Sequence, residues 1–251
     1  MFSKLLFVGV FLVCSLSFVK QCGFYQQSKG LDNKSENNVD NSSDSFSSSK
    51  NGEPQLDSLI DFRDGQKYAV ILIGEQTWMA ESLRFETPDS WLNPDNPSHA
   101  YGRLYSMDAA QSACPLGWHL PTDQEWNQLE LTLGLPIEKA DEIGWRGAHG
   151  VKMKSRQGWI NEGDGTNSSG FNAFPTGFYY EESFEGGLGA SSGFWSAKVK
   201  PNLLGMNDLM DEVKNGAWVR FLAAPHKGVN RFFDDNTNPS SWGLACRCIK
   251  D

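Results

Sequence analysis

The tryptophan residues divide the chain into two parts that must behave differently. All nine of them lie beyond residue 77, whereas residues 26–55 contain only three apolar side chains. Such a polar segment cannot bury enough surface to offset the conformational entropy that folding would remove. We therefore predict a disordered tether over residues 23–57 and one folded domain over residues 58–251.

The first 22 residues have the pattern of a secretory signal. Lys4 precedes a 15-residue apolar run over residues 5–19, which is shorter than the ~20 residues that cross a bilayer. Small residues allow cleavage after Ser17. Alternatively, Cys22 becomes the acylated first residue of a lipoprotein, because it follows the apolar run directly and precedes a polar tether. We expect an extracytoplasmic protein of the cell envelope or surface, with Cys22 as the lipidation site and a lipid anchor to the membrane.

The charge of the chain excludes one class of partner. Its 31 acidic and 22 basic residues give a formal net charge of −9. Nucleic acids require clustered positive charge. We therefore expect no nucleic-acid partner.

The folded part begins with a hairpin pattern and continues with two helices. Residues 68–73 and 76–80 are rich in β-forming side chains and flank a Gly-Glu turn. An alanine-rich helix is predicted over 107–114, ending before a proline. A second helix is predicted over 122–134, starting with the Thr-x-x-Glu pattern of a capping box. Short apolar runs between glycines follow, and the last of them, 242–249, is predicted to be a central strand. The expected class is α+β, with two N-terminal helices and a loop-rich sheet of short strands.

Beyond the signal the chain has three cysteines, which allow one disulfide and one free thiol. A bond from Cys114 to Cys248 would join residues 134 positions apart, and the chain-entropy model gives such a closure about 4–5 kcal/mol. Cys246 and Cys248 would share one face of a strand, so the pattern does not decide which of them pairs with Cys114. A Cys-x-Cys zinc clip is the alternative. Zinc is disfavoured because the histidines lack ligand spacing; they are His99, His119, His149 and His226.

Five motifs occur in one order along the folded part. They are Ile-Gly-Glu-Gln-Thr-Trp-Met-Ala-Glu-Ser-Leu at 73–83, Tyr-Gly-Arg-Leu-Tyr at 101–105, Cys-Pro-Leu-Gly-Trp-His-Leu-Pro-Thr-Asp-Gln-Glu-Trp at 114–126, Gly-Phe-Trp-Ser at 193–196 and Gly-Leu-Ala-Cys-Arg-Cys-Ile at 243–249. With these motifs the chain resembles the Fibrobacter succinogenes major paralogous domain family.

The resemblance implies exported bacterial proteins, often lipoproteins, with a C-type lectin-like fold related to the sulfatase-modifying-factor group. It also implies a disulfide between Cys114 and Cys248, with Cys246 as a buried thiol. The chain departs from the family in two places. The loop at 91–99 lacks the second cysteine pair of many members, and residues 197–216 contain an insertion.

The expected function is non-catalytic binding at the cell surface, with carbohydrate or an envelope protein as the partner. Aromatic platforms with a few polar groups are typical of such sites. Trp91, in a polar loop, is the candidate aromatic contact, and most other tryptophans are predicted to be core, notably Trp78, Trp118, Trp126 and Trp195. The candidate polar contacts are Asp234, Asp235 and Asn236.

We expect no cofactor. Calcium is possible because hard cations bind clustered oxygens, either at the three polar contacts or near Asp164 and Asn167. One alternative function is a thiol-dependent oxidase related to the formylglycine-generating enzymes. Its reactive pair would be Cys246 and Cys248, but a structural disulfide would occupy one of these cysteines. The other alternative is a purely structural envelope protein.

Overall fold

The computed structural model describes residues 57–184, 187–198, 216–235 and 242–251, and residues 54–251 form one compact unit. Within these ranges no helix is both long and apolar enough to cross a membrane. Several predictions lie outside the described residues: the signal, the tether, Cys22, Asn236 and most of the 197–216 insertion.

Two sheets form the framework of the domain. The five-stranded sheet is antiparallel, in the order β1 (Asp57–Ile60), β2 (Lys67–Ile73), β3 (Gln76–Met79), β13 (Ile249–Lys250) and β6 (Trp118–His119). The predicted hairpin is confirmed as β2 and β3. Gly74 has a φ of +62° in its turn, a conformation that glycine adopts without steric strain.

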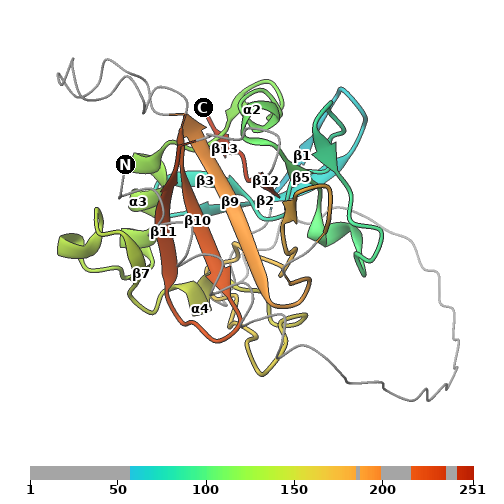
Figure 1. Ribbon diagram of the computed structural model, residues 1–251. Coiled ribbons are helices and arrows are strands. Elements are labelled where there is room, and N and C mark those ends of the chain that lie inside the picture. The colour runs from blue at the N-terminus through green and yellow to red at the C-terminus, as the bar shows by residue number, and fades with distance from the viewer. Residues whose placement is uncertain (1–56, 185–186, 199–215, 236–241) are drawn as a thin grey trace, which may run out of the picture. The chain divides into compact units, whose positions relative to one another are not determined.

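The second sheet has eight strands and contains the longest one, β9. Its order is β4 (Ser90–Trp91), β5 (Leu104–Tyr105), β12 (Trp242–Ala245), β9 (Ser191–Lys198), β10 (Ala217–Ala223), β11 (Val229–Asp234) and β7 (Gly144–Arg146), with β8 (Tyr179–Tyr180) paired to β12. β9, β10 and β11 lie at the front of the domain in Figure 1.

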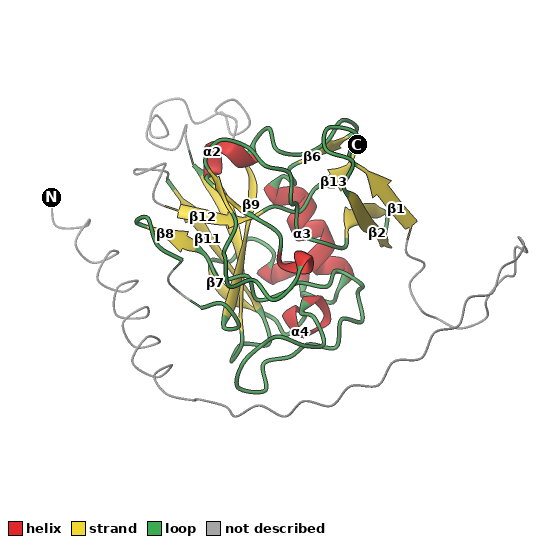
Figure 2. Ribbon diagram, turned by 90° about the vertical axis from the view of Figure 1, so that its right-hand side faces the viewer, coloured by secondary structure: helices red, strands yellow, loops and turns green. Residues whose placement is uncertain are grey.

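Helix α3 (Asp123–Thr132) lies between the two sheets (Figure 2). Its predicted capping box is confirmed, because Thr122 Oγ1 accepts from the Glu125 amide and the Glu125 carboxylate accepts from the Thr122 amide. Trp126 and Leu129 are fully buried on this helix, so α3 supplies the apolar layer that both sheets share.

The other predicted helix is shorter than expected. Helix α2 covers only Met107–Ala110, and the next three amides bond three residues back rather than four. This tighter winding, with a proline at position 115, ends the helix four residues before Cys114. The structure also contains α4 (Gly150–Met153) and two 3₁₀ turns, His99–Tyr101 and Ile137–Lys139. The domain is therefore α+β, with more sheet than helix.

The final apolar run was predicted as one strand, but the structure divides it between the two sheets. β12 lies inside the eight-stranded sheet and β13 inside the five-stranded one. Between them, Arg247 is fully buried and donates to the carbonyl oxygens of Met79, Phe171 and Asn172. These bonds turn the chain from one sheet to the other. Burial lowers the pKa of Arg247 to about 9.

The core is aromatic. Trp78, Trp126 and Trp195 are fully buried, as predicted, whereas Trp118 is only half-buried. Trp118 belongs to β6, the edge strand of the five-stranded sheet. An edge strand has a neighbouring strand on one side only, so its side chains are less completely covered.

The C-terminus is held by a histidine between two carboxylates. His119 Nδ1 lies 2.7 Å from Asp251 Oδ1, and its Nε2 lies 2.9 Å from Glu125 Oε1. Partial burial lowers the pKa of His119, but the two acidic partners outweigh it and raise the pKa above its ordinary value. The bridge therefore stabilises the domain fully below about pH 6.5, and this contribution disappears as the pH rises through the raised pKa.

We expect the difference in melting temperature between the wild type and His119→Gln to be positive at about pH 5.5 and to shrink towards about pH 8.5. Differential scanning calorimetry at both pH values measures it. His99→Gln, which changes an exposed histidine in a 3₁₀ turn, is the control and should show no such trend. A difference that grows with pH would contradict this assignment.

Candidate functional site

The inner face of the eight-stranded sheet carries a buried ionic network centred on Glu130 of α3. Its Oε1 accepts from Arg220 Nε at 2.6 Å, both its oxygens accept from Arg146 Nη2, and His149 Nε2 lies 2.8 Å from Oε2. Burial raises the pKa of Glu130, but the hydrogen bond to His149 and the two guanidinium charges outweigh it and lower the pKa. Glu130 is therefore held as a carboxylate.

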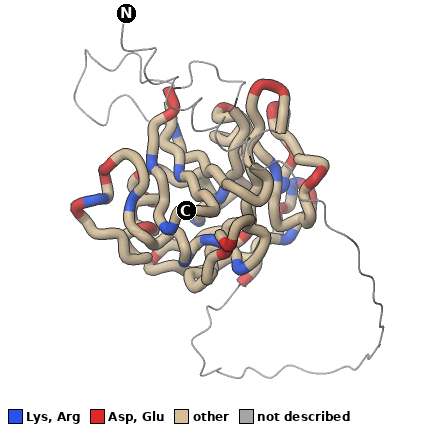
Figure 3. The backbone as a smooth tube through the Cα atoms, turned by 60° about the horizontal axis from the view of Figure 1, so that its bottom comes forward, with Lys and Arg blue, Asp and Glu red and all other residues tan. Residues whose placement is uncertain are grey.

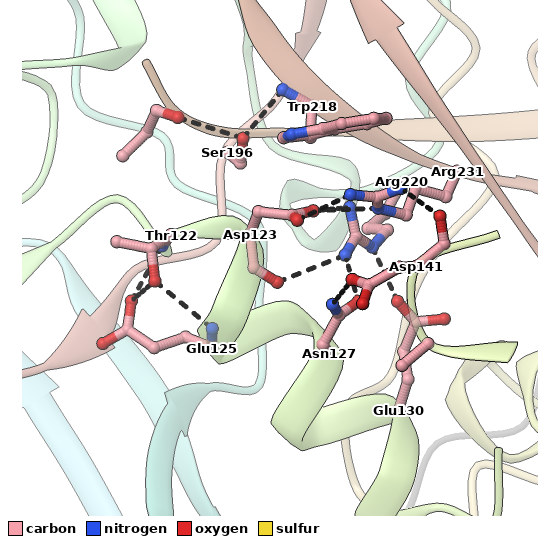
Figure 4. Close-up of polar contacts among 12 residues, drawn as sticks. Thr122, Asp123, Glu125, Asn127, Glu130, Asp141, Ser196, Trp218, Arg220 and Arg231 are labelled. Carbon is pink, nitrogen blue, oxygen red and sulfur yellow. Dashed lines mark hydrogen bonds and ion pairs between the residues drawn. The ribbon is translucent and has the colours of Figure 1, made fainter. Parts of the chain in front are cut away.

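Asp123, about two helical turns earlier on α3, extends this network (Figure 4). It pairs with Arg220 at 2.8 Å and accepts from Arg231 at 3.1 and 2.7 Å. The Arg231 guanidinium lies over the Trp218 ring, 3.3 Å from its centroid. Burial raises the pKa of Asp123, and its two arginine partners lower it overall. Both carboxylates are thus fixed in their charged form, and the network attaches α3 to the sheet.

The outer face of the same strands carries aromatic side chains. In the strand register Phe221 of β10 lies opposite Asn230 of β11, which lies opposite Trp145 of β7. Side chains directly opposite one another in antiparallel strands share a face. Trp145 is 40% exposed and stacks on His226, with ring centroids 3.8 Å apart and planes 9° apart.

From Phe221 the ring contacts continue towards β12. Phe178 lies 6.4 Å from Phe221 and stacks on Trp242 at 5.3 Å, and Trp242 meets the edge of Tyr180 at 5.3 Å. Every one of these rings is half-buried. Phe232 of β11 joins this set through Phe221, with ring centroids 6.5 Å apart. We call the set the aromatic strip; it consists of Phe178, Tyr180, Phe221, Phe232 and Trp242.

A helix covers a different part of the same face. α2 packs against β5, β9 and β12, and its Met107 and Ala110 share one buried cluster with Trp195, Val219 and Leu244. Figure 1 views these strands from the side away from α3. The aromatic strip therefore lies beside the part of the face that α2 covers, and its rings keep part of their surface accessible.

The predicted contact Trp91 lies outside the strip. It was expected in a loop, but the structure places it in β4, where its ring stacks on Tyr179 with centroids 4.1 Å apart. The Trp91 ring also covers Gly243, because a Cβ atom at that position would lie only 2.8 Å from the ring. Gly243 and Trp242 are consecutive in β12, so they face opposite sides of the sheet.

Asp234, one of the predicted polar contacts, lies on the face of the sheet that carries the aromatic strip. It is the last residue of β11 and shares a face with Phe232 and Asn230, because side chains alternate along a strand. Asp235 follows the strand and is exposed. The structure thus places one predicted polar contact on the aromatic face, whereas β5, β12, β9 and β10 separate it from Trp91 on β4.

At the other possible calcium site, near Asp164 and Asn167, both side chains accept hydrogen bonds from backbone amides. Asp164 accepts from the Trp159 amide at 2.9 Å, and Asn167 accepts from the Asn172 amide at 2.8 Å. In the described parts of the chain, no group of three or more His, Cys, Asp and Glu side chains is arranged to hold a metal ion.

The cysteines adopt the arrangement that the resemblance implied. Cys114 is bonded to Cys248, with Cα atoms 5.8 Å apart. Cys246 is a free thiol without solvent exposure, and burial raises its pKa. Neither sulfur of the Cys-x-Cys pair is therefore presented to a substrate as a thiolate.

A shallow groove of about 450 Å³ lies away from the aromatic strip. It is lined by Asp57, Ser58, Lys67, Ala69 and Glu81, at the β1–β2 edge of the five-stranded sheet. Its lining contains no aromatic side chain, so it lacks the flat apolar surface of the strip.

The sequence did not predict the strip, because strand register decides which residues share its face. The one local signal for this face was the i, i+2, i+4 spacing of Asn230, Phe232 and Asp234.

One comparison with known proteins identifies the family. The model of the Fibrobacter succinogenes major domain matches residues 71–250, a range that includes the disulfide, the eight-stranded sheet and the five-stranded sheet except β1 and the start of β2. No curated protein and no solved structure matches the chain. The chain therefore belongs to the Fibrobacter succinogenes major domain family.

Proposed function

We propose that the protein is an exported, surface-anchored binding module without catalytic activity, and that it binds a polysaccharide on the aromatic strip. The observation that carries the proposal is the continuous series of half-buried rings on the outer sheet face, from Phe221 through Phe178 to Trp242 and Tyr180. A sugar ring has a flat face of C–H bonds that packs on an aromatic ring. Its hydroxyl groups need polar partners beside that ring, and Asn230 and Asp234 are polar residues on the same face.

The charge near the strip favours an uncharged polymer. Glu181 is exposed, and its carboxylate next to the Tyr180 hydroxyl raises the pKa of Tyr180. Anionic polysaccharides would meet like charge at Glu181, whereas hydroxyl groups can donate to its carboxylate.

Three further observations support binding without catalysis or nucleic-acid recognition. Glu130 and Asp123 are held as arginine-bound carboxylates. Cys246 is a buried thiol with a raised pKa. Lys and Arg are interspersed with Asp and Glu along the described chain rather than gathered on one face (Figure 3).

We also propose a C-type lectin-like fold for the domain and a lipid anchor at Cys22. For the fold, the support is that the first and last described strands, β1 and β13, belong to one sheet. In addition, a disulfide joins the segment after α2 to the turn before β13. For the anchor, the support is the sequence pattern around Cys22.

We expect the chain from residue 23 onward to be retarded by a neutral polysaccharide in affinity gel electrophoresis, and Trp242→Ala to weaken this binding about tenfold or more. Xylan, glucomannan, hydroxyethyl cellulose and polygalacturonate form the panel, each with calcium and with a chelator. Loss of the central ring removes a stacking partner, so the effect should appear for every polymer that binds.

Phe62→Ala is the matched control, because Phe62 is an aromatic residue that is 94% exposed and outside the strip. Trp91→Ala determines whether the Trp91–Tyr179 stack extends the surface. Equal retardation of the wild type and a folded Trp242→Ala variant would disprove the assignment to the strip. Retardation by none of the polymers would disprove carbohydrate binding.

A further inference from the structure

We propose that Trp145 and His226 form the far end of one binding track that starts at Trp242, so that the ligand is an extended glycan chain crossing the strands rather than a single sugar. This inference rests on the proposed function and names the form of its ligand. Trp242 lies on β12 and Trp145 on β7, with β9, β10 and β11 between them. Four strand spacings of about 4.8 Å separate the two tryptophans by roughly 19 Å, which is too far for one sugar unit to contact both.

The strand register makes the two ends part of one row. Phe221, Asn230 and Trp145 are consecutive cross-strand neighbours on one face. On the other side Phe221 contacts Phe178, which stacks on Trp242. The row therefore runs across the strands without passing to the inner face.

Trp145 is held in place although it is exposed. Its ring stacks on His226 in the turn between β10 and β11. Lys154, only 2% exposed, fixes this turn from below by donating to the carbonyl oxygens of Ala223, Ala224 and His226 at 3.1–3.2 Å. A ring that is already oriented loses little conformational entropy when a ligand binds to it.

The chemistry of the row distinguishes a glycan from an apolar partner. A ring, an amide and a ring follow one another as Phe221, Asn230 and Trp145. The Asn230 amide oxygen is buried and has no hydrogen-bond partner among the described residues, and an apolar helix or peptide side chain placed over this row would leave it without one. A glycan offers C–H faces to the rings and hydroxyl groups to the amide. Peptide addition at the edge strand β7 is the competing mode.

The test is calorimetric titration of the chain from residue 23 onward with cello- and xylo-oligosaccharides from two to six units long. We expect the affinity to rise with length, and Trp145→Ala to lower the hexasaccharide affinity about tenfold while leaving the disaccharide affinity nearly unchanged. Ile143→Ala is the control, because Ile143 is 70% exposed and two residues away. Thermal unfolding of each variant verifies that the domain is folded.

The possible outcomes distinguish failure of this inference from failure of the proposed function on which it rests. Binding that is independent of length, or a hexasaccharide affinity unaffected by Trp145→Ala, would overturn the track but not the aromatic strip. A Trp145→Ala effect on disaccharide and hexasaccharide alike would also overturn it, because Trp145 would then belong to the primary contact. Failure of every oligosaccharide and polysaccharide to bind would overturn the proposed function as well.

Discussion

Replacing both Cys114 and Cys248 by alanine is expected to lower the free energy of unfolding by about 4–5 kcal/mol. The bond joins residues 134 positions apart, and closing so long a loop removes much of the conformational entropy of the unfolded chain. For a domain of this size the loss corresponds to a decrease in melting temperature of about 10–20 °C. Differential scanning calorimetry of the wild type and the double variant measures it directly.

Cys246→Ala is the control for this experiment, because Cys246 is as buried as Cys248 but forms no bond. We expect it to cost only about 1 kcal/mol, the effect of a small cavity. Wild-type protein treated with a reducing agent should unfold near the temperature of the double variant. A double variant no less stable than Cys246→Ala would show that the bond contributes nothing.

The second large effect is expected for Glu130→Gln. The substitution preserves the shape of the side chain but removes the negative charge that Arg146, Arg220 and His149 share. Leaving buried cations without their partner destabilises proteins by about 3–5 kcal/mol. Arg220 still has Asp123, so Arg146, whose side chain is fully buried, should account for much of the loss. Urea denaturation gives the free energy difference.

Glu138→Gln is the matched control, since Glu138 is exposed in a 3₁₀ turn. It should change stability by less than about 0.5 kcal/mol. If Glu130→Gln were equally mild, the network could not be what attaches α3 to the sheet. A network that is only structural would also leave polysaccharide binding by folded Glu130→Gln unchanged.

Features encoded by neighbouring residues were predictable from the sequence. The hairpin of β2 and β3 follows from β-forming residues on both sides of a glycine turn. Helix α3 follows from the Thr122–Glu125 capping box and the helical spacing of its apolar residues. The Cys114–Cys248 bond was implied by the resemblance to the family, because spacing alone left Cys246 as an equal partner.

Features that depend on distant residues were not predictable in this way. Glu130 and Arg220 are 90 positions apart, so no local pattern relates them. The final run was expected to be one strand, because its composition does not show that Arg247 bonds to three carbonyl groups and turns the chain between sheets. The aromatic strip combines residues from β10, β11, β12 and the segment around β8, and its common face follows only from their register.

Hydroxyl-radical footprinting, read by mass spectrometry, tests the central claim most directly because it measures the accessibility of individual side chains. It should be carried out on the chain from residue 23 onward, with and without the neutral polysaccharide that binds most tightly. Binding on the outer sheet face predicts reduced oxidation of Trp242, Tyr180 and Phe178, with Phe62 unchanged. Undiminished oxidation of those three rings at saturating polysaccharide, or protection confined to the β1–β2 groove, would contradict the account.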